Sequence, residues 1–575
     1  MNSQIFHPFV LPFVLGMAFV LAYCAVGLFR VIGQLPKDDR KKFWRSLVTP
    51  KTAWANIRDL FGDCLFHVKI WKRNPILGYM HTAIAFGWFM IIVIGHVMLF
   101  TLKPLEGVDA EGFARIFSNA YYPIFFKYFA EETPVFAFLM DFFLLMIISG
   151  ILIAVVKKIH SKMVGVKRIM HFGFADNMIR FALWTIFPFR LIAEKSNIMA
   201  FWWLYSLDLM VFMFMLPFTR YMHIPTEALF ILLRHAGLKP REPRKGYALA
   251  QIYSCPSCGL CIDACPMSVN DKNSGNTSAY FMKRLRNGDK EEAQRIAETC
   301  MQCGKCVAVC PVTIESCDIK MSQREAVPYQ IKSDHSYLEN VAAETKENAK
   351  ILYFAGCMTQ LTPKIMRAMK QIMEAAGEKY EFMDKDGGIC CGRPMLLSGK
   401  KAEAQAMIAK NTELIKKSGV KRLVLSCPIC YKVFKEEYHL EGIEILHHTQ
   451  YIDELVKQGK LKVDKNDINY VYHDPCELGR AFGVYDEPRE VIESIGHLRK
   501  AKSEKELSIC CGGSLGSFYL TQQERDEITA NSVNDLMFNN PDEIVTACPL
   551  CLKTFARKSP VVVKDIAEVV ANQLR

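Results

Sequence analysis

The sequence lacks the glycine-rich patterns by which nucleotide-binding proteins hold phosphate groups. It contains neither a G-x-G-x-x-G fingerprint nor a P-loop, so we expect no NAD, FAD or ATP site in the chain itself. Long apolar runs are missing after residue 225, where the chain has the pattern of a soluble α/β protein. No base-reading motif accompanies the formal net charge of +12, so nucleic acid is not an expected partner.

Before residue 225 the sequence consists largely of long apolar segments. A helix needs about 20 apolar residues to cross a bilayer, and five segments reach that length. These segments are 8–32, 76–100, 134–157, 174–194 and 199–222. Arg180, Pro188 and Arg190 interrupt the fourth segment. We therefore expect a bundle of five transmembrane helices.

Basic residues in the loops indicate how these helices are oriented. The first and third loops are rich in Lys and Arg, including Lys41, Lys42, Lys157 and Lys158, whereas the second loop, within 101–133, is more acidic. The positive-inside rule then places the N-terminus outside and everything after Tyr221 in the cytoplasm. The expected location is the inner (cytoplasmic) membrane, crossed several times.

Two histidines lie at matching depths in two of the apolar segments. His81 is near the cytoplasmic end of the second segment and His223 near that of the fifth. Such a pair can ligate one haem iron from both faces. For either residue alone, the alternative is an interfacial histidine that hydrogen-bonds lipid or backbone.

With these histidines and the P-F-T-R-Y-M-H-I ending of the fifth segment, this half resembles the haem b membrane subunits of respiratory nitrate reductase and heterodisulfide reductase. In two-haem members, the resemblance implies a second ligand pair at the positions held here by Ile91 and Tyr205. Isoleucine cannot ligate iron and tyrosine is an unusual choice, so one haem b is expected. A second haem held by His7 and His96 is the alternative.

Eighteen of the 21 cysteines fall into four motifs, while Cys24, Cys64 and Cys317 stand apart. Short C-x2-C loops make awkward structural disulfides and good metal chelates, which disfavours an extracellular disulfide framework. Two of the motifs repeat the pattern C-x2-C-x2-C-x3-C-P, which is typical of bacterial two-cluster ferredoxins. Zinc is the alternative, but zinc sites usually pair two separated C-x2-C knuckles.

The ferredoxin pattern predicts two cubane [4Fe–4S] clusters, because the fourth cysteine of each motif ligates the other cluster. One predicted set is Cys255, Cys258, Cys261 and Cys310. The other is Cys300, Cys303, Cys306 and Cys265. Segments 278–287 and 289–299 between the motifs have helical patterns. This part resembles the helical dicluster ferredoxin domain of succinate dehydrogenase and heterodisulfide reductase relatives.

The last third of the chain contains an internal repeat. Each copy has a single cysteine, then a Cys-Cys-Gly triplet, then a C-x2-C unit, and strand-like runs precede the first and last of these. The first copy comprises Cys357, Cys390, Cys391, Cys427 and Cys430, and the second comprises Cys476, Cys510, Cys511, Cys548 and Cys551. With helical patterns such as 362–376 and 401–417 between, two α/β units are expected, with cysteines at the carboxyl ends of strands.

Two sets of five such cysteines resemble the CCG domain of the catalytic heterodisulfide reductase subunit. The resemblance implies one or two non-cubane [4Fe–4S] clusters, held by these ten residues as the catalytic set. Zinc sites or structural thiols are the alternative, and they leave the adjacent Cys-Cys pairs unexplained. The expected fold class is multidomain: a helical transmembrane bundle, a helical dicluster ferredoxin domain and a duplicated α/β CCG domain.

The predicted domains are 1–232 (transmembrane, haem b), 233–345 (dicluster), 346–460 (first CCG repeat) and 461–575 (second CCG repeat). Relatives of this fused build include membrane oxidoreductases that pass electrons from electron-transferring flavoprotein to the quinone pool. The resemblance thus implies an oxidoreductase with a cytoplasmic flavoprotein or flavin dehydrogenase as partner and quinone as substrate. The alternatives are a disulfide or heterodisulfide reductase using quinol electrons, and a non-catalytic wiring and anchoring subunit of a flavin dehydrogenase.

Overall fold

The computed structural model describes residues 7–101, 121, 124–125, 133–164, 170, 173–196, 198–328, 350–385, 387 and 389–575. The acidic loop on which part of the predicted orientation depends lies mostly outside these residues. The chain divides into two compact units, Met1–Leu260 and Cys261–Arg575. The domain boundaries expected from the sequence stay predictions.

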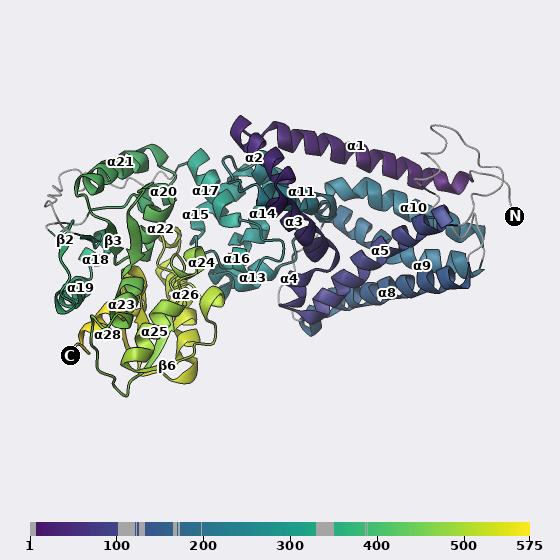
Figure 1. The fold of residues 1–575 in the computed structure, drawn as a ribbon. Coiled ribbons are helices and arrows are strands. Elements are labelled where there is room, and N and C mark those ends of the chain that lie inside the picture. The colour runs from purple at the N-terminus through teal and green to yellow at the C-terminus, as the bar shows by residue number, and fades with distance from the viewer. Residues whose placement is uncertain are drawn as a thin grey trace. The chain divides into compact units, whose positions relative to one another are not determined.

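The first unit is built on long helices that pack side by side (Figure 1). They are α1 (Leu11–Gly33), α5 (Pro75–Thr101), α8 (Pro134–Ile159), α9 (Phe174–Ser196) and α10 (Met199–Met215). Shorter helices follow α1 and α10, namely α2 (Lys37–Val48), α3 (Pro50–Asp59), α4 (Val68–Trp71), α11 (His223–His235) and α12 (Gly246–Ser254). A π-helical turn, Leu60–Leu65, continues α3 toward α4.

Within the described residues, four helices rather than the expected five are long and apolar enough to cross a membrane. They are Pro8–Gly33, Pro75–Met98, Pro134–Ile159 and Met199–Phe218. The expected fourth span does form a helix, α9, but its sequence carries too many charged residues to qualify. Two of them, Arg190 and Glu194, form a buried ion pair at 2.8 Å, so these two charges lie inside the unit, whereas Lys195 is exposed.

The fifth apolar segment also ends earlier than the sequence suggested. Helix α10 stops at Met215, and two short 3-10 turns, Leu216–Phe218 and Arg220–Met222, lead into α11. Pro217 explains the break, because proline has no backbone N–H to donate to the preceding turn. His223 is therefore the first residue of α11, outside the long apolar helix.

The second unit begins with the helices that surround the ferredoxin-like motifs. These are α14 (Ser278–Asn287), α15 (Lys290–Thr299), α16 (Lys305–Ala308) and α17 (Ser316–Ala326). The expected helices at 278–287 and 289–299 are confirmed. Gly288, at a φ of +80°, ends α14, and the Asp289 carboxylate caps α15 by accepting from the Glu292 backbone N–H.

The rest of the second unit contains two parallel sheets of four strands each. The first has the order β2 (Tyr380–Phe382), β1 (Ile351–Phe354), β3 (Arg422–Leu425), β4 (Glu444–His447). The second has the order β6 (His497–Arg499), β5 (Asn469–His473), β7 (Glu543–Thr546), β8 (Val562–Asp565). The equal strand orders agree with the duplication expected from the sequence.

Helices connect the strands of each sheet, as parallel pairing requires. The first repeat has α18 (Cys357–Gln360), α19 (Pro363–Ala375), α20 (Arg393–Leu397), α21 (Lys401–Lys417), α22 (Pro428–Glu436) and α23 (His448–Lys457). The second has α24 (Gly479–Phe482), α25 (Asp486–Ile495), α26 (Gln522–Leu536), α27 (Pro549–Phe555) and α28 (Ile566–Ala571).

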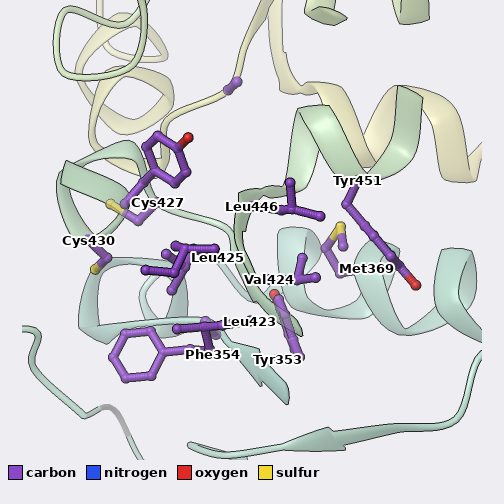
Figure 2. Close-up of a cluster of buried hydrophobic side chains, with 14 of the residues drawn as sticks. Tyr353, Phe354, Met369, Leu423, Val424, Leu425, Cys427, Cys430, Leu446 and Tyr451 are labelled. Atoms are coloured by element: carbon purple, nitrogen blue, oxygen red, sulfur yellow. The ribbon is translucent and has the colours of Figure 1, made fainter. Parts of the chain in front are cut away.

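The core of the first repeat lies on the central strands, where Leu423 and Val424 are fully buried. Figure 2 shows Cys427 and Cys430 at one side of this cluster, beside Leu425, with Tyr451 at the opposite side. The two thiols thus lie where the apolar core ends and the strand gives way to a helix.

Arg324 ties the dicluster part of the second unit to the first repeat. Its guanidinium is fully buried and donates to the carbonyl oxygens of Ala297, Cys300 and Leu397 at 2.7 to 2.9 Å. The first two close the end of α15, and the third belongs to α20. Gly399 lets α20 approach, because a Cβ on this residue would lie 2.1 Å from the Arg324 carbonyl oxygen.

This contact gives a test with a matched control. Gly399→Ala and Gly419→Ala both put alanine at a left-handed backbone, with φ of +81° and +66°, and Gly419 has open space around its Cα. Gly419→Ala should cost about 1–2 kcal/mol of strain. Gly399→Ala should lower the thermal unfolding midpoint clearly further, and equal midpoints would show that the α17–α20 contact contributes nothing.

Candidate metal centre

Two cysteines of each repeat directly follow the carboxyl ends of the two central strands. Cys357 begins the helix after β1 and Cys427 the turn after β3, while Cys476 and Cys548 follow β5 and β7. In each sheet the chain leaves these central strands toward opposite edges, so a crevice forms outside their ends. The expectation of cysteines at the carboxyl edge is confirmed for these positions.

The two crevices join into one cavity of about 250 Å³. Nine of the ten repeat cysteines line it, all except Cys390, together with Met301, Met358, Phe518 and other mostly apolar side chains. The structure thus brings the two predicted sets together around one cavity. Sequence reasoning had treated the repeats as separate sites.

Within this space the thiols contact one another in series. In the first repeat, hydrogen-bonding contacts run from Cys357 to Cys390, Cys391, Cys430 and Cys427. In the second repeat they run from Cys476 to Cys510, Cys511, Cys551 and Cys548, with 3.3 Å between the Cys511 and Cys551 sulfurs. A further contact joins Cys427 to Cys548 across the repeats.

Several of these contacts favour thiolate over thiol. The pKa of Cys391 is lowered to about 6, because the thiols of Cys390 and Cys430 hydrogen-bond its sulfur. The pKa of Cys511 lies well below its ordinary value because of hydrogen bonds from Cys510 and Cys551. Thiolate is the form of cysteine that binds metal.

A buried carboxylate holds the first cysteine of the first repeat in position. Asp384 accepts from the backbone N–H groups of Ala355 at 2.9 Å and Gly356 at 2.7 Å, directly before Cys357. Gly356 has a φ of +82°, and a Cβ there would lie 2.9 Å from the Cys430 sulfur. The turn therefore needs glycine, and Asp384 fixes it.

A buried ion pair lies across the cavity between the repeats. The Arg393 guanidinium donates to Glu477 Oε1 from Nε at 3.2 Å and from Nη2 at 2.7 Å. Glu477 Oε2 is buried without a hydrogen-bond partner among the described residues. The pair joins α20 to the turn after Cys476, so it aligns the two cysteine sets.

The second ferredoxin-like set lies in the same unit. Cys300 and Cys306 both contact Cys317, the cysteine that the motifs left unassigned. Lys320 Nζ lies 3.5 Å from the Cys300 sulfur and 2.9 Å from Ser278 Oγ. Although burial opposes it, the sulfurs of Cys300 and Cys306 raise the pKa of Lys320 above its ordinary value.

Sequence reasoning missed Cys317 and Lys320, although a signal was available. Cys317, Lys320 and Arg324 recur at helical spacing on α17, so one face of that helix points at the motif. Cys265 completes this environment, since it interacts electrostatically with Lys320, Cys303 and Cys306.

One contact links the ferredoxin-like part to the second repeat. The thiols of Cys303 and Cys510 hydrogen-bond each other, and Cys265 and Cys476 pack around the same small cluster with Met267 and Met301. The thiol series of the repeats therefore continues into the predicted second cubane set.

The other ferredoxin-like set is divided between the two compact units. Cys255 and Cys258 belong to the first unit, whereas Cys261 and Cys310 belong to the second. Cys258 lies within electrostatic range of Lys157, at the end of α8. The grouping of these four cysteines stays a prediction.

The two predicted haem histidines both belong to the first unit. His81 and His223 interact electrostatically, and the Nδ1 of each ring bonds a backbone carbonyl oxygen at 2.8 Å, Leu77 for His81 and Arg220 for His223. Such bonds orient imidazoles that ligate metals. His67, which sequence reasoning missed, packs against His81 with ring centroids 5.4 Å apart.

The positions of a second ligand pair hold other chemistry. Ile91 is buried, and the Tyr205 hydroxyl accepts from Arg190 Nη1 at 3.3 Å beside the Arg190–Glu194 pair. His7 Nδ1 accepts from the Phe9 backbone N–H, and His96 Nδ1 bonds the Ile92 carbonyl. The second haem held by His7 and His96 stays a hypothesis.

The donor set in the second unit fits iron–sulfur clusters. It consists of buried or half-buried thiols that face shared space, with several held toward the thiolate form, and thiolates are the ligands of these clusters. Among the described residues, no group of three or more His, Cys, Asp or Glu side chains is arranged to hold a single metal ion.

The Asp384 contact yields a prediction about iron content. Asp384→Ala should free the turn before Cys357 and weaken metal binding at the first repeat by roughly 10–100-fold, as loss of a ligand-orienting partner typically does. Asp542→Ala is the control, because this exposed carboxylate also accepts a backbone N–H, from Asn469. Iron and acid-labile sulfide per purified chain are the readout, and equal contents in the two variants would contradict the role of Asp384.

Comparison with known proteins matches these sites to two families. The model of the cysteine-rich domain matches residues 351–435 and 470–556. The model of the 4Fe-4S dicluster domain matches residues 251–314. Both copies of the repeat and both ferredoxin-like motifs are covered.

Curated relatives share parts of the chain. EtfAB:quinone oxidoreductase of Syntrophomonas wolfei is 32% identical over 40% of this chain and 35% of its own length. A subunit of the dihydromethanophenazine:CoB–CoM heterodisulfide reductase from Methanosarcina barkeri is 26% identical over 56% of this chain and 78% of its own length. The probable iron-sulfur-binding oxidoreductase FadF of Bacillus subtilis is 24% identical over 56% of this chain and 46% of its own length.

The chain spans little more than a third of the Syntrophomonas protein and less than half of the Bacillus protein. The names of these relatives are those of oxidoreductases or their subunits, and the Bacillus protein is named as iron-sulfur-binding. The chain thus carries a 4Fe-4S dicluster domain and a duplicated cysteine-rich domain of the kind found in iron–sulfur oxidoreductases, together with four helices, within the described residues, that are apolar enough to cross a membrane.

Proposed function

We propose that this chain is a membrane-bound iron–sulfur and haem b oxidoreductase that passes electrons between a cytoplasmic flavoprotein and the quinone pool. The observation that carries the proposal is the contact between Cys303 and Cys510. It joins the predicted second cubane set to the cysteines of both repeats, so electrons have a short path through the second unit. The four apolar helices give the same chain access to membrane quinone.

The cysteines have separate roles in this proposal. Cys300, Cys303, Cys306 and Cys265 hold one cubane cluster, and Cys255, Cys258, Cys261 and Cys310 hold the other. The five cysteines of each repeat hold a non-cubane [4Fe–4S] cluster, as the resemblance to heterodisulfide reductase implies. When bound, such clusters accept and release single electrons.

The surrounding residues shield these sites and balance their charge. Apolar side chains such as Met301 and Met358 line the cavity and limit the contact of its thiols with water. Lys320 sets a buried positive charge beside Cys300, which offsets the charge of thiolates. The Arg393–Glu477 pair holds the two repeats in register around the cavity.

In the first unit, His81 and His223 are the proposed axial ligands of one haem b. The electrostatic interaction of the two rings and their Nδ1 bonds to Leu77 and Arg220 support this role. Between two imidazoles, the haem iron would exchange one electron at a time. The proposed orientation keeps the N-terminus outside and the iron–sulfur parts in the cytoplasm.

The flavoprotein partner rests on one relative. The Syntrophomonas protein is named an EtfAB:quinone oxidoreductase, and a flavoprotein donor suits a chain without nucleotide fingerprints of its own. A flavin dehydrogenase that uses this chain as a wiring and anchoring subunit is a variant of the same idea.

A single cavity lined by both cysteine sets and the Methanosarcina relative favour a second candidate, a disulfide or heterodisulfide reductase.

The first experiment separates these functions. The full chain, purified anaerobically in detergent, is mixed with reduced electron-transferring flavoprotein and a menaquinone analogue, and flavin reoxidation is followed optically. We expect reoxidation that needs both the chain and the quinone, that Cys510→Ser abolishes, and that Cys24→Ser leaves intact, since Cys24 lies outside the motifs. Quinol oxidation that depends on an added disulfide, with no reaction of the flavoprotein, would support the reductase instead.

The haem ligands have their own test. His81→Ala or His223→Ala should each abolish the b-type absorbance of the dithionite-reduced protein, because one imidazole cannot supply both axial bonds. His235→Ala serves as the control, since this imidazole of the first unit bonds the Asp59 carboxylate and belongs to neither ligand pair. An unchanged reduced spectrum in either of the first two variants would discard the assignment.

A further inference from the structure

Arg480 lies where the dicluster part of the second unit meets the second repeat. On α24, its Nε donates to the Cys303 carbonyl oxygen at 2.6 Å, and its Nη1 donates to the Ser508 carbonyl and hydroxyl oxygens at 2.9 and 3.0 Å. One guanidinium thus bonds the backbone of both parts.

The third nitrogen of this guanidinium, Nη2, differs from the other two in its hydrogen bonding. Arg480 Nη2 is buried and has no hydrogen-bond partner among the residues that the structure describes. A buried N–H donor without an acceptor is costly, and native proteins rarely leave one unmatched. The nitrogen therefore points to an acceptor that is not a protein oxygen.

The charge of Arg480 is likewise unmatched by carboxylates. No Asp or Glu of the described chain lies within ion-pair distance of it, whereas Arg393, on the other side of the cavity, pairs with Glu477. The anionic groups that interact with Arg480 are first the sulfurs of Cys303, Cys476 and Cys510. Because an isolated buried charge is strongly disfavoured, these sulfurs would be its counterions once a bound cluster holds them as thiolates.

The three sulfurs belong to two different predicted centres. Cys303 is part of the second cubane set, while Cys476 and Cys510 are part of the second repeat. Arg480 is therefore shared between the two centres that the Cys303–Cys510 contact brings together. In the first repeat no cysteines need to share a cation in this way, because Arg393 is already neutralised by Glu477.

We propose that Arg480 is a positioning residue that serves both of these iron–sulfur centres at once, holding their cysteines together and leaving Nη2 to donate to the inorganic sulfide of a bound cluster. This inference rests on the proposed function, because it takes the cysteines to be cluster ligands. Net charge and hydrogen bonds to sulfur set the reduction potentials of iron–sulfur clusters. A shared cation should thus raise both potentials together, which keeps neighbouring centres matched for electron transfer.

Three variants test this in the full-length protein. Arg480→Gln removes the charge, Arg480→Lys keeps it with fewer donors, and Arg499→Gln removes an exposed arginine of the same repeat that bonds Asn469. Each is titrated anaerobically with dithionite in the presence of redox mediators, and the centres are followed by electron paramagnetic resonance. Iron content is measured in parallel.

We expect Arg480→Gln to shift the reduction potentials of the second cubane centre and of the second-repeat centre to more negative values. The potential of the first-repeat centre should change less. Arg480→Lys should restore part of the shift, and Arg499→Gln should match the native protein. Native potentials for every centre in Arg480→Gln, at full iron content, would overturn the proposal. If Arg480→Gln does not fold, Arg480→Lys should still shift the potentials of these two centres in the same direction, because it lacks the Nη2 donor, and native potentials at a native iron count would overturn the proposal as well.

The titration uses neither flavoprotein nor quinone. Failure of the flavoprotein assay with normal cluster signals would therefore count against the proposed function alone. Unchanged potentials in a chain that still reduces quinone would count against Arg480 alone.

Discussion

The convergence of parallel strands on one edge is the constraint on which the second unit depends. In each sheet the two central strands end side by side, and at three of the four turns after them the chain enters a helix that begins at or next to a cysteine. Thiols from segments far apart in sequence are thereby collected at one edge of each sheet. The two sheets then face these edges into one cavity, which both repeats share.

Buried charge is handled differently in different parts of the chain. Two buried arginines form ion pairs whose net charge is zero, Arg190 with Glu194 and Arg393 with Glu477. Lys320 and Arg480 instead face sulfur. The unpaired cations thus occur beside the thiols that the dicluster part contributes, which is where bound clusters would bring negative charge.

The same residues that support the chemistry also hold the second unit together. Arg324 closes the end of α15 and reaches α20, and Gly516 brings the second repeat so close to the Cys300 carbonyl that a Cβ would lie 2.5 Å from it. Displacing either repeat would therefore disturb the cysteines of the ferredoxin-like part. Stability and electron transfer share one set of contacts in this arrangement.

The sequence by itself determined the local features. Cysteine spacing, the strand-like runs before Cys357 and Cys427, and the helices at 278–287 and 401–417 depend on residues near one another, so their patterns can be read directly. Only the tertiary structure decided that Arg190 and Glu194 of α9 pair inside the first unit, that α10 ends before Pro217, and that both repeats share one cavity. It also decided the hydrogen bond between Arg480 and Cys303, which are 177 residues apart. Such contacts arise from the packing of whole elements, so no local sequence pattern predicts them.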